Sequence, residues 1–440
     1  MRRRRLSRGV QLLGLLIAVL GLCGYWLTRD VQRTVLSPEE ARLLNPEGAA
    51  FQASFVVAGR DYDYDPAGPL VWQDGEWVRS FTTEPRLGYR TDTILYVNFV
   101  GNRIYMVSVP RDIFLPRFQI PINEVYAYPE TYGSASRADN LRRAVSELLG
   151  VPIDYYAVIN IDIFERLVDA IGGVELEVPR AMVYRDQAAG LEIDLQPGFQ
   201  RLSGAEAAGF VRYRELLRGD IDRIDNVKTL AYAVLGRLQE LNVRAALKLP
   251  ELIDTYFDEV DTNASPALFS QLLPRLGEMT LEAATLPTSD MEGSGRFLET
   301  DPEAVEAFLA TLFGGTARTV TRTPEGRVLL TDRSGVPGAG DRVRELLLAA
   351  GVAPEQLRVR RGAPDAITRV IVTRESLAAA PFYADLLGVG WQQIDRFAVD
   401  ADIEVILGQD AARFDLFRRA QAPTPQMSTP PSSPHVSTGG

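Results

Sequence analysis

The pattern that most constrains the fold is a close alternation of short apolar strands and amphipathic helices between residues 55 and 178. Runs rich in β-branched and aromatic residues predict strands at 55–58, 94–99, 104–109, 158–161 and 174–178. Apolar positions spaced three and four apart predict helices at 137–149 and 163–171. Because each such helix has one face to bury against a sheet, the alternation indicates an α/β layer architecture.

A second informative stretch runs from Gly198 to Leu241. Ser203 with Glu206 three residues later is a capping box, and it predicts a short helix over 205–210. A longer, half-buried helix is expected to begin near Asp220, because apolar residues then recur at steps of three and four to the end of the stretch.

Three arginines mark this stretch: Arg212 and Arg214 between the two helices, and Arg223 in the first turn of the second. A cation in a first turn opposes the helix dipole, so helix stability does not explain Arg223. An anion at the helix N-terminus would explain it, and guanidinium groups grip phosphate oxygens two at a time. The three side chains could therefore surround a phosphate or pyrophosphate. The alternative is a solvated charged surface, with the arginines paired to Glu215, Asp220 and Asp222.

Composition excludes several classes of function. The only histidine, His435, lies in a Pro/Ser/Thr-rich tail, and the only cysteine, Cys23, lies in an apolar run. These positions exclude a Ser-His-Asp or Cys-His nucleophile, a His/Cys metal site and an intrachain disulfide. The formal charge of −11 argues against general nucleic-acid binding. Catalysis must then use Asp, Glu, Arg, Ser, Thr or Tyr, with a hard metal such as Mg²⁺ where one is needed.

The N-terminus predicts a membrane anchor. Residues 1–8 form a basic tail, and residues 9–28 are an apolar run of the length needed to cross a bilayer once, about 20 residues. The basic flank keeps the N-terminus in the cytoplasm, so the remaining chain is expected outside the cell membrane. A cleaved signal peptide and a lipoprotein site at Cys23 are the alternatives. Residues 29–50 are a polar connector.

Further along, residues 51–314 are expected to form the main domain, with a long loop over 62–88 and helical and loop sequence up to Gly314. After a linker, residues 327–410 predict a second, small α/β domain, and residues 420–440 a disordered tail. The elements expected in the second domain are strands at 327–331, 359 and 370–372 and helices at 341–350 and 382–387.

Charged residues collect at predicted strand ends in the main domain: Asp61, Arg90, Asp92 and Arg111. Ligands of α/β sheets gather at strand ends, so these side chains could meet the arginines of the 198–241 stretch at one rim. Asp61 and Asp92 beside phosphate oxygens would form a Mg²⁺ site, with few protein ligands and several waters. The alternative interpretation makes both aspartates N-caps or turn residues.

Seven short segments, in this order and spacing, carry a resemblance to a known family. They are Gly59-Arg60-Asp61, Arg90-Thr91-Asp92-Thr93, Val107-Ser108-Val109-Pro110-Arg111-Asp112, Val168-Asp169-Ala170-Ile171-Gly172-Gly173-Val174, Leu195-Gln196-Pro197-Gly198, Val211-Arg212-Tyr213-Arg214, and Gly219-Asp220 with Arg223. With them, residues 56–235 resemble the LytR-CpsA-Psr family of membrane-anchored cell-envelope phosphotransferases. Residues 327–410 resemble the small LytR-type C-terminal domain often attached to these proteins.

The resemblance implies a mixed central sheet flanked by helices, and an apolar tunnel that holds a polyprenyl lipid. It implies transfer of a phosphoglycan from an undecaprenyl-pyrophosphate carrier to a peptidoglycan hydroxyl with Mg²⁺ or Mn²⁺. By position, Asp61 and Asp92 would hold the metal, and Asp92 is also a candidate catalytic residue. The pyrophosphate would be held by Arg90, Arg111, Arg212, Arg214 and Arg223, of which Arg111, Arg212 and Arg214 are also candidate catalytic residues.

The chain departs from the family pattern at two positions. The family often has Gln where this chain has Val227, and Lys where this chain has Pro121. The two replaced side chains would contact the pyrophosphate or a sugar. A non-catalytic scaffold that binds the lipid carrier, and a pyrophosphatase that uses water as acceptor, are the alternative functions.

Overall fold

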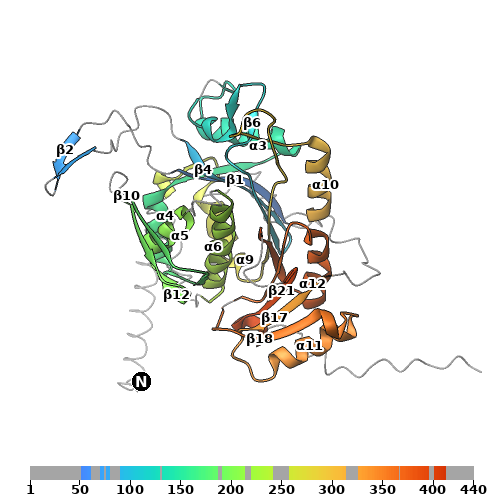
Figure 1. The fold of residues 1–440 in the computed structure, drawn as a ribbon. Helices are drawn as coiled ribbons and strands as arrows, with labels where there is room; N and C mark the ends of the chain where they lie inside the picture. Colours follow the sequence, from blue (N-terminus) through green and yellow to red (C-terminus); the bar gives the residue numbers. More distant parts are fainter. Residues whose placement is uncertain are drawn as a thin grey trace, which may run out of the picture.

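The computed structural model describes residues 51–60, 70–73, 76–79, 90–128, 131–186, 191–213, 220–240, 257–313, 326–365, 367–395 and 401–412. Within these ranges the chain is built around one sheet of 11 strands (Figure 1). Its order is β13 (Asp261–Thr262), β8 (Tyr155–Asn160), β1 (Gln52–Arg60), β4 (Thr91–Val100), β5 (Arg103–Ser108), β14 (Thr280–Thr285), β20 (Gly390–Gln393), β19 (Arg369–Val372), β21 (Ile403–Leu407), β17 (Val328–Asp332) and β18 (Leu357–Arg361).

The sheet is mixed. β1 pairs antiparallel with β4 and parallel with β8, while β14 lies parallel to β5 on one side and to β20 on the other. β4 and β5 form the hairpin that the turn at Gly101 predicts, and this glycine has φ of 61°, a conformation that a residue without Cβ adopts at no steric cost. The prediction of a mixed α/β fold with a central sheet flanked by helices is confirmed.

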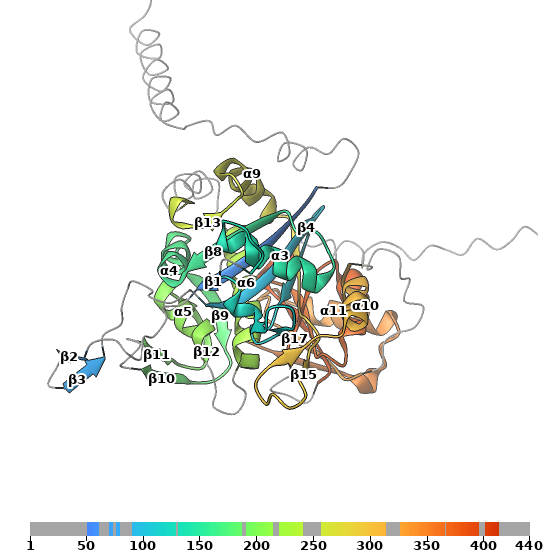
Figure 2. The ribbon, with the colours of Figure 1, turned by 90° about the horizontal axis from the view of Figure 1, so that it is seen from above.

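Helices cover both faces of the sheet because strand side chains alternate between the faces. Along β1, Val56 and Ala58 belong to a core with α3 (Arg137–Leu149), α10 (Pro302–Phe313), α11 (Ala339–Ala349) and α12 (Ala380–Leu387). Ala53 and Phe55 face the opposite core, to which α6 (Asp220–Glu240) and α9 (Pro266–Leu276) contribute. Figure 2 shows the same region from above, with α3 and α6 near β1.

A third, smaller core lies beside α6. It joins α4 (Ile161–Ala170), α5 (Gly204–Arg212), β9 (Val174–Val178), β10 (Met182–Asp186), β11 (Leu191–Leu195) and β12 (Gly198–Leu202). The predicted capping box is present at the start of α5, with the Ser203 side chain accepting from the Glu206 backbone N–H. α4 and α5 touch at Gly204, where an added Cβ would lie 2.1 Å from the Glu165 carbonyl oxygen. This contact sets the place where α5 begins.

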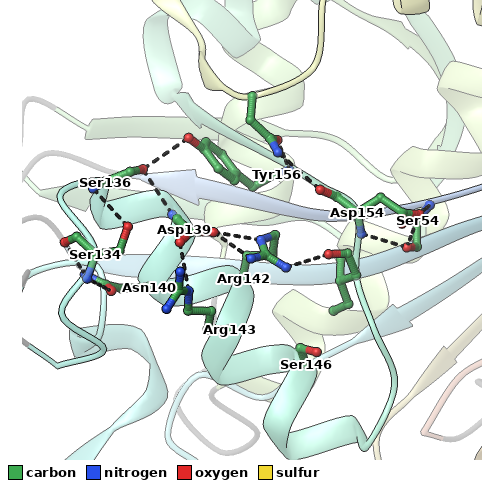
Figure 3. A network of polar contacts seen from close by, with 12 residues as sticks. Ser54, Ser134, Ser136, Asp139, Asn140, Arg142, Arg143, Ser146, Asp154 and Tyr156 are labelled. Atoms are coloured by element: carbon green, nitrogen blue, oxygen red, sulfur yellow. Dashed lines mark hydrogen bonds and ion pairs between the residues drawn. The ribbon is translucent and has the colours of Figure 1, made fainter. Parts of the chain in front are cut away.

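Polar contacts tie α3 to the sheet at its N-terminal end (Figure 3). Ser136 is the N-cap of α3 and its hydroxyl also donates to the Tyr156 hydroxyl of β8 at 3.1 Å. In β1, Ser54 donates from its hydroxyl to Asp154 at 2.7 Å. These bonds hold α3, β1 and β8 together from three chain segments.

Two expectations for the main region are wrong. The segment expected as a long loop over 62–88 contains a hairpin of β2 (Leu70–Gln73) and β3 (Glu76–Arg79). The segment expected to be helix and loop before Gly314 contains β14, a central strand of the sheet. β14 has the sequence TLEAAT, which consists mostly of short or polar residues. It shows neither the alternation of a strand nor the three-and-four spacing of a helix, so its burial between β5 and β20 decides its conformation.

The remaining short elements of the main region are β6 (Phe114–Leu115), β7 (Ile120–Pro121), η1 (Ile122–Glu124), η2 (Phe257–Glu259), β15 (Ser289–Asp290) and β16 (Leu298–Glu299). In the rest of the described chain they are η3 (Pro354–Gln356), η4 (Leu377–Ala379) and η5 (Gln409–Ala412).

Residues 326–412 as described form what we call the C-terminal unit. The strands expected near 327–331, 359 and 370–372 and both expected helices are present, while β20 and β21 were not predicted. The unit continues the main sheet through the β14–β20 pair, and its apolar residues belong to the same core as α3 and α10. That residues 327–410 form a separate domain stays a prediction.

Among the described residues, no helix is both long and apolar enough to cross a membrane. The predicted basic tail, anchor, connector and C-terminal tail lie outside the described residues.

Candidate functional site

A pocket opens where β4 begins, β5 ends and the N-terminal part of α6 lies over both strands. The cavity itself measures about 10 Å³, and the empty space is about 250 Å³ when the open solvent at its mouth is counted. Asp92 and Thr93 come from β4, Ser108 from the end of β5, and Arg223 from α6. The other lining residues are Ile94, Leu95, Val109, Arg111, Ile224 and Val227. A charged rim thus surrounds an apolar wall.

Asp92, Arg111 and Arg223 meet in this pocket. The Oδ1 atom of Asp92 lies 2.6 Å from the Nη1 atom of Arg111, and the Oδ2 atom of the same carboxylate lies 3.7 Å from the Nη1 atom of Arg223. One carboxylate therefore sits between two guanidinium groups that sequence reasoning placed at the same rim. Asp92 is the second residue of β4, so the alternative interpretation of this aspartate as an N-cap or turn residue is wrong.

Arg223 is the most buried of the three, with 4% of its surface exposed. This excludes for Arg223 the alternative of a solvated charged surface. A guanidinium group that is so fully excluded from solvent requires oxygen partners, since burying an unpaired charge costs much free energy. Asp222, expected as a partner of the arginines of that stretch, pairs through Oδ2 with Arg180 at 2.8 Å, and its pairing with those arginines stays a prediction.

Two other predicted arginines are not among the residues that line the pocket. Arg90 immediately precedes β4, is largely exposed, and pairs with Glu124 at 3.1 Å. Arg212 is the half-buried last residue of α5. Their roles as pyrophosphate ligands stay predictions.

Asp61 and Arg214 lie outside the described residues. The residue before Asp61, Arg60, pairs in the sheet with Thr91, the neighbour of Asp92. The structure thus brings the end of β1 to the start of β4, as the proposed pairing of the two aspartates requires.

Three residues at the site were not predicted as functional. Ser108 lines the pocket, is buried, and its hydroxyl has no hydrogen-bond partner among the described residues. Asn123 donates its backbone N–H to the Arg111 carbonyl and accepts from the Thr91 hydroxyl, so it fixes the segment that carries Arg111. Arg180 lies over the Tyr213 ring at 5.9 Å. Alternation along β5 could have identified Ser108, but Asn123 comes from the three-residue η1 and Arg180 from the loop after β9, and neither segment is long enough to show a period.

For a divalent metal, the described part of the site offers one carboxylate, Asp92. Clusters of three or more His, Cys, Asp or Glu side chains are absent from the described residues. Mg²⁺ is commonly held by one or two carboxylates together with substrate phosphates and water, so this donor set fits a metal that arrives with a phosphorylated ligand. It does not fit a metal held by protein ligands alone.

The arrangement suits a phosphorylated ligand with an apolar portion. Two arginines can bind phosphate oxygens, the carboxylate can bind a cation or accept a proton, and the pocket wall beyond them is apolar. The implied tunnel for a polyprenyl chain stays a prediction.

A model of the LytR_cpsA_psr family matches residues 55–311, which is more than half of the chain. The regulatory protein MsrR of Staphylococcus aureus is 30% identical over 183 residues, covering 40% of this chain and 51% of MsrR. The cell wall biosynthesis protein LcpA of Corynebacterium glutamicum is 28% identical over 339 residues, covering 69% of this chain and 64% of LcpA.

The polyisoprenyl-teichoic acid–peptidoglycan teichoic acid transferase TagU of Bacillus subtilis is 28% identical over 181 residues, covering 40% of this chain and 54% of TagU. The chain therefore spans about half the length of MsrR and of TagU. Among solved structures, that of TagV from B. subtilis has a TM-score of 0.44 at 21% identity, covering 59% of this chain and 96% of TagV.

Proposed function

The chain belongs to the LytR_cpsA_psr family, and from that premise we propose that it is a membrane-anchored phosphotransferase of the cell envelope. It would move a glycopolymer phosphate from an undecaprenyl-pyrophosphate carrier to a hydroxyl of peptidoglycan. The relative TagU is named for a transfer of this kind, and LcpA for cell wall biosynthesis. The single observation that carries the proposal is the convergence of Asp92, Arg111 and Arg223 in a pocket with an apolar wall.

The reaction breaks one phosphoanhydride bond. The acceptor oxygen attacks the phosphorus that carries the glycan, the bond from that phosphorus to the bridging oxygen breaks, and polyprenyl phosphate leaves. Little covalent work is required of the protein, because the barrier falls when groups aimed at the phosphates neutralise the developing charge and align the reactants. Arg111 and Arg223 supply this stabilisation, with Arg90, Arg212 and Arg214 as further proposed ligands.

Asp92 has two possible tasks. It would hold Mg²⁺ or Mn²⁺ together with Asp61, and the bound metal would neutralise phosphate charge. Alternatively its carboxylate would accept the proton from the attacking hydroxyl. In either task Asp92 must be released in part from the arginines, which then turn to the phosphate oxygens.

The apolar wall favours a lipid-linked donor over a free sugar nucleotide. Ile94, Val109 and Ile224 line the pocket beside the charged rim. Ile94 and Val109 are only 2% and 3% exposed, so this wall marks where an apolar group would lie and by itself contributes little burial free energy, at roughly 25 cal/mol per Å². The predicted membrane anchor over residues 9–28 would place the pocket near the bilayer that holds such a donor.

The test measures release of polyprenyl phosphate from a lipid-linked pyrophosphate glycan by the purified full-length protein, with Mg²⁺ and a peptidoglycan acceptor. We expect Arg111→Ala, Arg212→Ala, Arg214→Ala and Asp92→Ala each to lower turnover by 10²- to 10³-fold, as loss of one such contact typically costs about 3–4 kcal/mol. Arg201→Ala is the matched control, because Arg201 is exposed and pairs with Glu175 on β9 away from the pocket.

The outcomes separate the alternatives. A donor that binds to the wild type and is never turned over would favour a non-catalytic scaffold. Release that is equally fast without any glycan acceptor would favour a pyrophosphatase. A loss in the Arg201 variant as large as in the four site variants would show that the pocket is not the site.

A further inference from the structure

One face of α6 carries a polar stripe that lies against the sheet and the C-terminal unit, with two of its four residues buried and two half-buried. The stripe consists of Asp225, Lys228, Thr229 and Tyr232, whose spacing of three and four places them on one side of a helix. A polar stripe on an amphipathic helix ordinarily faces water. Here α6 lies between β9 and β12 on one side and the strands of the C-terminal unit on the other (Figures 1 and 2).

Two residues of the stripe accept hydrogen bonds from the C-terminal unit. The backbone N–H of Asp395, just beyond β20, donates to Asp225 at 2.9 Å. Gln392 of β20 donates from its side-chain amide to the Thr229 hydroxyl at 3.1 Å.

Nearer the middle of α6, the buried guanidinium of Arg369 lies 5.3 Å from the centre of the Tyr232 ring. The hydroxyl of Tyr232 donates to the Leu281 carbonyl of β14. α6 is thus bonded to the sheet and to the C-terminal unit at once.

Lys228 is the central residue of the stripe and is only 1% exposed. Its Nζ lies 2.9 Å from the Asp225 Oδ1 and donates to the Thr285 hydroxyl at 2.9 Å. Burial lowers the pKa of Lys228, against the attraction of Asp225. A lysine is rarely buried so fully unless paired, and this one joins α6 to the last residue of β14.

The Lys228 contact lies directly behind the pocket. Thr285 is the register partner of Ser108, which lines the pocket. On α6, Val227 also lines it, and Arg223 stands little more than one turn before Lys228. The Lys228–Thr285 bond therefore links α6 to the sheet next to the place where Arg223 approaches Asp92.

A second set of contacts holds the C-terminal unit to the sheet without touching α6. Glu282 of β14 accepts from the Trp391 indole at 3.0 Å and from Arg103 at 2.7 Å, and Arg103 also pairs with Asp385 of α12 at 3.0 Å. Arg103 begins β5, at the opposite end from the pocket. These contacts provide a control for attachment of the unit as such.

We propose that Lys228 and Asp225 are positioning residues, which fix α6 between the sheet and the C-terminal unit and so hold Arg223 at its distance from Asp92. The C-terminal unit then acts in the reaction by supporting α6, without contacting substrate. Only the kinetic readout below rests on the proposed function. The effect is expected in turnover, because a reacting group misplaced by about 1 Å can cost 10²-fold.

The experiment uses the full-length protein with Lys228→Met, Asp225→Asn, the double variant, and Thr285→Val, which removes only the acceptor on the sheet. Asp385→Ala is the control in the second set of contacts. Removing one member of a buried ion pair destabilises the fold when the remaining charge is left uncompensated, so Thr285→Val, which leaves the pair in place, keeps the proposal testable if Lys228→Met does not fold. Asp225 keeps the Asp395 N–H and is 19% exposed, and Thr285→Val keeps the Lys228–Asp225 pair.

Three readouts are compared: melting temperature, kcat and KM for the lipid-linked donor, and hydrogen exchange of the backbone amides of residues 221–227. We expect Lys228→Met and Thr285→Val to lower kcat at least tenfold, to change KM less than threefold, and to speed exchange at these amides at least tenfold. Asp385→Ala should change none of them. The double variant should be no worse than its more severe single variant, since the pair acts as a unit.

Normal kcat and normal exchange in folded Lys228→Met and Thr285→Val proteins would overturn the proposal. A loss of kcat that only follows a fall in melting temperature, matched by Asp385→Ala, would overturn it also, since attachment of the unit alone would then explain the effect. If the wild type turns over no donor, the proposed function fails, while the exchange rates still decide whether Lys228 holds the start of α6.

Discussion

Damage to an anion site ordinarily weakens binding of the anion. Replacing Asp92 by Asn should instead strengthen that binding, provided that metal is absent. The Asp92 carboxylate sits between Arg111 and Arg223, with contacts of 2.6 and 3.7 Å. Without metal it neutralises the two guanidinium groups and repels an incoming phosphate. We therefore expect Asp92→Asn to bind metal-free inorganic pyrophosphate more tightly than the wild type, although it loses turnover.

The magnitude follows from the geometry. A phosphate oxygen held by the same arginines would lie about 4 Å from the carboxylate, where two unit charges repel by about 1 kcal/mol in water and about 4 kcal/mol at an effective dielectric constant near 20. The Asp92 side chain is 29% exposed, so solvent screening places the gain near the lower bound. A gain of about 1.4 kcal/mol corresponds to a tenfold lower Kd.

Isothermal titration calorimetry with inorganic pyrophosphate, first in a chelator and then in Mg²⁺, measures this directly. Asp385→Asn is the control, because it also removes one negative charge, next to Arg103 at the end of β5 far from the pocket. It should leave the Kd for pyrophosphate unchanged both in the chelator and in Mg²⁺. With Mg²⁺ present, the advantage of Asp92→Asn should disappear, because a metal ligand is lost as well. Unchanged or weaker binding of Asp92→Asn in the chelator would refute the view that Arg111 and Arg223 hold the anion in competition with Asp92.

Two further predictions concern stability. Burial raises the pKa of Asp410 to about 6 against the opposing hydrogen bonds from Thr368, so the folded state binds more protons than the unfolded state between about pH 4 and 6. The free energy of unfolding should therefore fall as pH rises through that window, and urea titrations should show the fall reduced in Asp410→Asn; an unchanged slope would contradict this. Gly204→Ala should lower the free energy of unfolding by about 1–3 kcal/mol, because its Cβ would meet the Glu165 carbonyl at 2.1 Å. Gly209→Ala in the same helix meets only the Ile193 side chain at 3.4 Å and should be nearly neutral, so equal melting temperatures for the two variants would argue against the close approach of α4 and α5.

Much of the fold could be predicted because its signals are local. The helix over 137–149 and the strand over 174–178 have the predicted limits, set by caps, turn glycines and periodicity. Among the elements that were not predicted are β14 and the hairpin β2–β3. The hairpin strands LVWQ and EWVR lie in a stretch rich in Gly and Pro that indicates a loop, and the conformation of β14 depends on strands from distant parts of the chain on both sides.

The residues of the candidate site likewise differ in how strongly the sequence alone indicated them. Asp92, Arg111 and Arg223 could be selected from sequence because they stand at predicted strand ends and a helix start, where ligands of α/β sheets gather, and because a cation in a first turn opposes the helix dipole. Ser108 gave a weaker signal, and Arg180 gave none, because its position over Tyr213 depends on how the loop after β9 packs.

The sequence by itself determined most of the segments that become strands and helices and which charged side chains are available, since these depend largely on neighbours a few residues apart. Only the tertiary structure decided that one carboxylate stands between two arginines, and that the polar stripe of α6 lies against β20 and β19. The physical reason is that burial and charge pairing arise where segments distant along the chain meet. An aspartate or lysine has the same local pattern whether water or another strand covers it.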